Sequence, residues 1–200
     1  SAGALLVKVA NEAYKASLTG LEFSSGIPGT IGGGVFMNAG AYGTEMKDLV
    51  KSVHVVTPDG KESKIVEAKD LDMSYRHSAL MENGYIVTEV VFELKNGDQT
   101  EIAANMKEFA EKRNSKQPVQ YPSAGSFFKR PEGYFAGKLI EDAGLKGLTV
   151  GGAQVSQLHA GFIINIGGAT SKDVVQLMHL VQNTVYDKFG VMLEPEVRII

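Results

Sequence analysis

Glycine is the first residue type whose density in this sequence points to chemistry. Residues 24–43 read SSGIPGTIGGGVFMNAGAYG, without a charged side chain. Glycine loses more backbone freedom on folding than other residues, so this density indicates positive φ angles or a backbone that approaches another body closely. That body is either a packed neighbouring element or a bound cofactor, and the spacing leaves both interpretations open.

The spacing within this segment is compatible with binding of a phosphate or of the edge of a flavin ring. Gly26, Gly29 and Gly32 form a G-x-x-G-x-x-G run with Gly33 behind it, and residues 38–40 (Asn-Ala-Gly) extend it. Backbone N–H groups without neighbouring side chains can cradle an anion. The run is not the G-x-G-x-x-G dinucleotide fingerprint, and the sequence has no Gly-Lys-Ser/Thr phosphate loop.

Ser126 is the second candidate, in the stretch YPSAGSFFKRPEG. Small residues on both sides leave its hydroxyl open to a ligand, and Lys129 and Arg130 follow where they could meet a pyrophosphate or carboxylate. The stretch does not fit the G-x-S-x-G elbow of a serine nucleophile, so a proton donor is the better chemical interpretation. The alternative is a serine that caps the backbone of a local turn.

Glu196 and Arg76 are the remaining charged candidates. In LEPEVRII, a strand would place Glu194, Glu196 and Arg198 on one face, which could also be a solvated edge. Arg76, in DLDMSYRHS, could equally make an ordinary surface contact. The four histidines lack the spacing of metal ligands, and we expect no metal site.

Composition bounds the class of protein. The 200 residues are 44% hydrophobic and 22% charged, as in a globular protein of one large or two small domains. The net charge of −3 does not provide the overall positive potential that attracts nucleic acid. The absence of cysteine excludes disulfides and thiol catalysis, and suits a reducing cytosol. No apolar run approaches the roughly 20 residues of a membrane span. The beginning lacks a signal-peptide pattern and shows helical spacing from the fifth residue, so we expect a fragment.

Hydrophobic periodicity and turn signals predict mixed helices and strands without regular alternation, which is typical of an α+β protein. Asn96-Gly97-Asp98 indicates a turn and a boundary between two parts. The predicted helices cover residues 4–18, 99–113, 136–143 and 171–189. The predicted strands cover a hairpin around residues 58–60 and residues 85–94, 160–167 and 191–200.

Several long motifs, in order, resemble the UDP-N-acetylenolpyruvoylglucosamine reductase (UDP-N-acetylmuramate dehydrogenase) family, in its shorter second type. They are GIPGTIGGGVFMNAGAYG, YRHS, PSAGSFFKRP, AGKLIEDAGLKG, GGAQVSQLHAGFIIN and LEPEVR. The resemblance implies part of a vanillyl-alcohol-oxidase-like FAD-binding domain plus a smaller α/β substrate-binding domain. Residues 1–97 would be the second FAD-binding subdomain, residues 98–190 the substrate-binding domain, and residues 191–200 a strand returning to the FAD-binding part.

The resemblance also implies an activity in peptidoglycan precursor synthesis in the cytoplasm. Hydride would pass from NADPH to FAD and on to C3 of UDP-N-acetylglucosamine enolpyruvate, and a proton at C2 would complete UDP-N-acetylmuramate. Ser126 matches the proton donor, and Arg76 and Glu196 match the pair that polarises the substrate carboxylate and stabilises the enol. Residues that match the region holding the uridine diphosphate sugar are Lys116, Arg130 and His159. Residues that match the FAD-binding segment are Gly26, Ile27, Pro28, Gly29, Thr30, Gly32, Gly33, Asn38, Ala39 and Gly40.

One departure concerns the family's N-terminal FAD subdomain, which nothing in this sequence matches. The chain alone would then lack part of the flavin site, be inactive, and associate with itself through exposed edges. Two other functions stay open: a nucleotide-sugar binding module without redox activity, and an FAD oxidoreductase of the same fold with another substrate. A visible absorbance spectrum separates a flavoprotein from a binding module.

Overall fold

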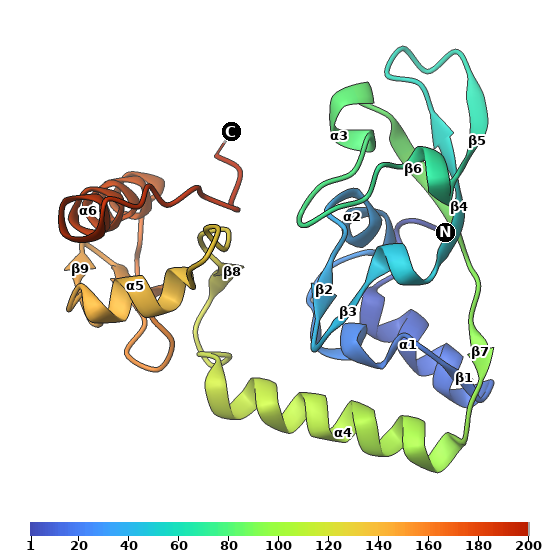
Figure 1. Cartoon of the computed structure of the whole chain (residues 1–200), viewed down its shortest axis with the longest axis horizontal. Coiled ribbons are helices and arrows are strands. Elements are labelled where there is room, and N and C mark those ends of the chain that lie inside the picture. Colours follow the sequence, from blue (N-terminus) through green and yellow to red (C-terminus); the bar gives the residue numbers. More distant parts are fainter. Residues whose placement is uncertain (200) are drawn as a thin grey trace. The chain divides into compact units, whose positions relative to one another are not determined.

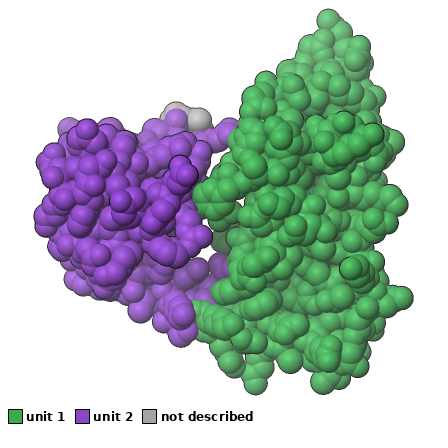
Figure 2. Space-filling view, in the orientation of Figure 1, with its two compact units in different colours: residues 1–112 green, residues 113–200 purple. Residues whose placement is uncertain are grey.

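The computed structural model describes residues 1–199 and forms two compact units, Ser1–Lys112 and the segment from Arg113 onward (Figures 1 and 2). Helices alternate irregularly with antiparallel strands in both units, which confirms the α+β class. Within the described residues, no helix combines the length and apolarity needed to cross a membrane.

The first unit contains short helices around small antiparallel sheets. Its helices are α1 (Leu6–Lys15), α2 (Ile31–Phe36) and α3 (Leu80–Asn83), the 3₁₀ turns η1 (Glu22–Gly26), η2 (Met46–Asp48) and η3 (Ala68–Asp70), and most of α4 (Gln99–Lys116). Its strands are β1 (Leu18–Thr19), β2 (Gly40–Ala41), β3 (Thr44–Glu45), β4 (Val50–Val56), β5 (Ser63–Glu67), β6 (Ile86–Phe92) and β7 (Lys95–Asn96).

The main sheet of this unit has the order β5-β4-β6, and every pairing in it is antiparallel. The predicted hairpin is confirmed, because Val56 pairs with Ser63 across the turn at residues 58–60. Val53 and Val55 point into the core, where they join Leu6 of α1 and Val35 of α2. The sheet therefore supports both the first helix and the glycine-rich segment.

Helix α1 ends earlier than the sequence predicts. It stops at Lys15, and Ser17 adopts a left-handed φ of 56°. Leu18 and Thr19 then pair with β7 as a short strand. A strand of two residues is too short to show a hydrophobic alternation, so the sequence alone could not distinguish it from the last turn of the helix.

The boundary between the two units lies within helix α4. The division lies between Lys112 and Arg113, inside the helix, and not at the turn around residue 97 that the sequence favoured. Ile102 is buried, and the ring of Phe109 stacks on Tyr42 at a centroid distance of 4.5 Å. These contacts attach most of the helix to the first unit.

The second unit packs two helices and a four-stranded sheet around one core. Its helices are α5 (Ala136–Asp142) and α6 (Ser171–Phe189), and its strands are β8 (Ser123–Ser126), β9 (Thr149–Val150), β10 (Ala153–Val155) and β11 (Phe162–Asn165). The sheet order is β8-β11-β10-β9. The prediction for α6 is confirmed: Thr170 caps its start, Gly190 ends it with a φ of 68°, and Leu177 and Val181 are buried.

The C-terminal segment differs from its prediction. Residues 191–199 form no regular strand, and Pro195 makes an isolated bridge with Phe128 in the second unit. Leu193 is buried in the core of this unit, and the Gln182 side chain donates a hydrogen bond of 2.8 Å to its carbonyl. The described backbone bonds therefore join the segment to the second unit, whereas the sequence predicts its return to the first part.

Candidate functional site

The glycine-rich segment packs against the beginning of the chain. The amides of Ile31 and Gly32 donate hydrogen bonds of 2.9 and 2.8 Å to the carbonyls of Ala4 and Ala2. A Cβ atom on Gly32 would lie 2.9 Å from the Cβ atom of Ala2, closer than real contacts allow. A Cβ atom on Gly34 would lie 3.3 Å from side-chain atoms of Leu6 and Met46. Close packing, one of the two interpretations that the sequence left open, therefore accounts for these glycines.

A hollow of about 340 Å³ lies beside the same segment. Thr30, Gly32 and Gly33, three of the residues matched to cofactor binding, line it together with Phe36 and Tyr85. This volume lies within the range of small-molecule pockets, and a lining of bare backbone and aromatic rings suits a flat heteroaromatic group. No pattern in the sequence singles out Phe36, the last residue of α2, or Tyr85, which precedes β6.

A second hollow, of about 450 Å³, lies beside Arg76 in the same unit. Gly40, Glu45 and Lys47 line it with Arg76, which has a left-handed φ of 54°. The guanidinium carbon of Arg76 lies 4.9 Å from the ring centroid of Tyr75. The structure thus brings Arg76 and the Gly40 end of the glycine-rich segment to one surface.

Glu45 supplies a fixed negative charge on this surface. Burial alone would raise its pKa, but hydrogen bonds from Lys47 and Asn38 outweigh burial, and the pKa of Glu45 is lowered below its usual value. Lys47 Nζ lies 2.8 Å from Glu45 Oε2. The sequence analysis missed Glu45 and Lys47, because their place beside Arg76 depends on how β3 and the turn η2 pack against a segment about 30 residues away.

Ser126 and Glu196 lie on adjacent backbone segments of the second unit. The amide of Glu196 donates a hydrogen bond of 2.9 Å to the carbonyl of Phe127, the residue that follows Ser126. Ser126 itself ends β8 opposite Phe162, and its side chain is exposed. The backbone segments of two of the three residues matched to catalysis are therefore adjacent, while Arg76 belongs to the first unit. Whether the three side chains converge stays a prediction.

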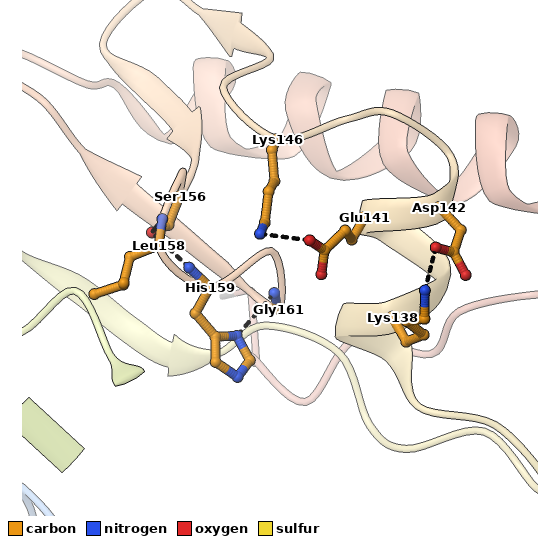
Figure 3. Close-up of polar contacts among 8 residues, drawn as sticks. All are labelled: Lys138, Glu141, Asp142, Lys146, Ser156, Leu158, His159 and Gly161. Carbon is orange, nitrogen blue, oxygen red and sulfur yellow. Dashed lines mark hydrogen bonds and ion pairs between the residues drawn. The ribbon is translucent and has the colours of Figure 1, made fainter. Parts of the chain in front are cut away.

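The ring of His159 lies beside the backbone of Gly161 (Figure 3). Its Nδ1 atom accepts a hydrogen bond of 3.1 Å from the amide of Gly161, and the carbonyl of Gly161 accepts one of 2.8 Å from the amide of Phe127. Burial lowers the pKa of His159, which is half-buried, and the nearby charge of Lys146 lowers it further. An accepting Nδ1 means a neutral ring with its hydrogen on Nε2.

Acidification is expected to destabilise the chain through His159. Its folded pKa is lowered, so around the unfolded value of 6.5 the unfolded state binds more protons. Stability is therefore full above about pH 6.5 and is lost as the pH falls through the folded pKa. Urea midpoints followed by circular dichroism between about pH 5 and 8 measure this loss. His159→Asn keeps an acceptor for Gly161 without titrating, so its midpoints should depend less on pH; an equal dependence in both proteins would contradict the assignment.

The remaining residues matched to substrate binding, Lys116 and Arg130, are both exposed. Lys116 is the last residue of α4, where a cation is favoured by the helix dipole. The guanidinium of Arg130 stacks on the ring of Phe135 at 3.8 Å, which orients its planar face. Each position leaves a cation at the surface of the second unit, and a role in binding a diphosphate stays a prediction.

Two family models match the chain. Residues 1–65 match a model described as an FAD binding domain. Residues 117–200 match the C-terminal domain of UDP-N-acetylenolpyruvoylglucosamine reductase. The two matches fall in the first and second units respectively.

Individual proteins with this name are similar over nearly the whole chain. The reductase of Pediococcus pentosaceus is 56% identical and that of Agathobacter rectalis 57% identical, each over 100% of this chain and over 66% and 63% of the relative. The crystal structure of the reductase from Thermus caldophilus superposes with a TM-score of 0.87 at 40% identity, covering 98% of this chain and 70% of that one. The chain spans just under two thirds of the length of the curated relatives that it matches.

Proposed function

The chain belongs to the UDP-N-acetylenolpyruvoylglucosamine reductase family, and from this membership we propose that the whole protein reduces UDP-N-acetylglucosamine enolpyruvate to UDP-N-acetylmuramate. The reaction would use NADPH and FAD in peptidoglycan precursor synthesis in the cytoplasm.

The observation that supports the proposal from the structure is the pairing of the two backbone segments that contain Ser126 and Glu196. Seventy positions of sequence separate them, and the hydrogen bond from the Glu196 amide to the Phe127 carbonyl places their segments side by side. A hydroxyl and a carboxyl on neighbouring segments can together deliver and orient a proton at one carbon atom.

The residues of the first unit fit part of an FAD molecule. The hollow beside Gly32 and Gly33 offers bare backbone at its rim and the rings of Phe36 and Tyr85 as apolar walls. A Cβ atom on Gly33 would meet only the Thr30 hydroxyl, at 3.4 Å, so this glycine keeps its outer side open to a ligand. When bound, FAD would supply the relay of hydride from NADPH to the enolpyruvyl group.

The chain's own residues would then donate the proton to C2 and stabilise the negative charge on the substrate. The Arg76 guanidinium offers two parallel donors to the substrate carboxylate, which would draw electron density away from the enol. The Ser126 hydroxyl would give its proton to C2, a step that a poor acid can perform when the acceptor is a strongly basic enolate and water is excluded. Lys116 and Arg130 would hold the diphosphate, and the Nε2–H group of His159 would donate a hydrogen bond to it.

Half-reactions of a full-length protein that contains this chain test the proposal. NADPH is expected to bleach the visible absorbance of oxidised flavin, and UDP-N-acetylglucosamine enolpyruvate to restore it, with a product heavier by two hydrogen atoms. Bleaching without restoration by this substrate would indicate an oxidoreductase with another substrate. A colourless full-length protein that binds the nucleotide-sugar would indicate a binding module.

The 200-residue chain is the matched comparison in the same experiment. We expect it to be colourless and to show no tight binding in an FAD fluorescence titration, because it spans under two thirds of its relatives and contains one part of the cofactor site. Self-association of the chain is also proposed, since Ile65 and Ile86 on the main sheet are 57% and 59% exposed. Stoichiometric flavin in this chain would show that the first unit suffices for binding.

A further inference from the structure

Asn38 is a fully buried polar residue at the bend that follows α2. Its exposed fraction is 0%, and its backbone has a left-handed φ of 44°. Asparagine tolerates this conformation better than most non-glycine residues, although the conformation is still unfavourable. A buried amide in such a conformation needs compensation from its hydrogen bonds.

The side chain of Asn38 uses each of its polar atoms within the chain. Its Nδ2 group donates bonds of 2.7 Å to the carbonyl of Ser74 and 3.0 Å to Glu45 Oε2, and its Oδ1 atom accepts one of 3.0 Å from the amide of Lys47. These partners fix the orientation of the amide, because an N–H donor must meet the oxygen and a carbonyl must meet the nitrogen.

The bond to Ser74 reaches the turn that carries Arg76. Ser74 and His77 exchange two backbone hydrogen bonds of 3.2 Å, and Arg76 lies between them with its φ of 54°. Ser78, one residue further, donates a bond of 2.7 Å to the carbonyl of Phe36. The turn is thus held at two points by the end of the glycine-rich segment, and one of those points is the Asn38 side chain.

We propose that Asn38 is a positioning residue for Arg76, acting through the Ser74 carbonyl and not through side-chain contact with a cofactor. The inference rests on the proposed function, in which Arg76 binds the substrate carboxylate. A guanidinium fork must match a carboxylate in direction as well as distance, and displacement by about 1 Å can reduce a rate by as much as 100-fold. The donors of Asn38 are already used, so its side chain has none to offer to FAD.

A double-mutant cycle in the full-length holoenzyme tests the role in catalysis. Asn38→Ala should slow reoxidation of the flavin by UDP-N-acetylglucosamine enolpyruvate by about 10- to 100-fold, with FAD affinity unchanged. In an Arg76→Ala background, Asn38→Ala should slow it no further than about twofold, since the two changes act on one group. The inference would be overturned if the double variant were slowed by the product of the two single-variant effects, or if Asn38→Ala weakened the affinity for FAD.

Asn165→Ala is the control, because it also removes two hydrogen bonds between an asparagine side chain and the backbone, here bonds that the side chain accepts from the amides of Gly167 and Ala169 in the second unit. Its loss of thermal stability is measured beside that of Asn38→Ala, and its reoxidation rate should stay within about twofold of the parent. A slowing equal to that of Asn38→Ala would show that stability alone explains the effect and would overturn the inference.

Amide hydrogen exchange in the 200-residue chain tests positioning without any activity. Asn38→Ala removes the acceptor of the Lys47 amide, so exchange there must accelerate. The inference requires acceleration at His77 as well, whose amide is bonded to the carbonyl that Asn38 holds. Unchanged exchange at His77 would overturn it. If the turn responds but the full-length parent does not reoxidise with the enolpyruvyl substrate, the proposed function fails and the positioning of Arg76 stands.

Discussion

Replacement of Ser126 with alanine is expected to slow flavin reoxidation by the enolpyruvyl substrate by about 10²–10⁴-fold in the full-length protein, the range that a positioned general acid supplies. Reduction of the flavin by NADPH should be unchanged, because no enol has yet formed. Substrate affinity should change little, since one hydroxyl contributes about 1 kcal/mol of net binding. Anaerobic stopped-flow absorbance resolves the two half-reactions.

Two further variants sharpen this prediction. Ser126→Cys keeps a proton to give and should recover part of the rate. Ser123→Ala removes a hydroxyl from the same strand β8, where Ser123 Oγ accepts a bond from the Gly125 amide, and should leave reoxidation near the parental rate. Normal reoxidation in Ser126→Ala would return Ser126 to the alternative of a turn serine.

Leu177→Ala is expected to destabilise the second unit by about 3–5 kcal/mol, through lost transfer energy and the cavity left behind. Leu177 has an exposed fraction of 0% and packs in the core that also contains Phe127 and Phe128, the residues after Ser126. Urea unfolding followed by circular dichroism measures the change in the free energy of unfolding.

Leu180→Ala is the control on the same helix. Leu180 lies three residues further along α6 but is 41% exposed, so the same chemical change leaves no closed cavity. Its effect should be below about 1 kcal/mol, a typical value for a substitution away from the core. Equal losses in the two variants would contradict the assignment of Leu177 to the core of this unit.

The sequence predicts best those elements whose stabilising contacts are local. Helix α6 is the example, because its cap at Thr170, its buried stripe and its stop at Gly190 all follow from residues within the helix. The hairpin of β4 and β5 is predicted for the same reason, since its turn residues fix the register. Family motifs added the candidate residues, and the structure brings Ser126 and Glu196 to neighbouring segments.

Contacts between distant positions could not be derived from the sequence. The approach of Gly32 to Ala2 and the three bonds of Asn38 depend on how separate segments meet, and no local pattern records them. The same holds for residues 191–199, which exchange backbone hydrogen bonds with residues 127–129. The glycine spacing therefore left a packed neighbour and a bound cofactor both open, and the structure shows that Gly32 and Gly34 approach other parts of the chain closely.

Helix α4 limits where genetic recombination can join this protein to a relative without loss of stabilising contacts. A genetic exchange at the turn near residue 97 would separate Ile102 and Phe109 from the partners in the first unit that cover them. An exchange between Lys112 and Arg113 would keep those contacts but leave residues 113–116 as a remnant too short to form a helix alone. Neither junction leaves the helix intact together with its contacts to the first unit. Recombination between relatives should therefore keep the helix and both units from one parent, or replace the helix and both units together.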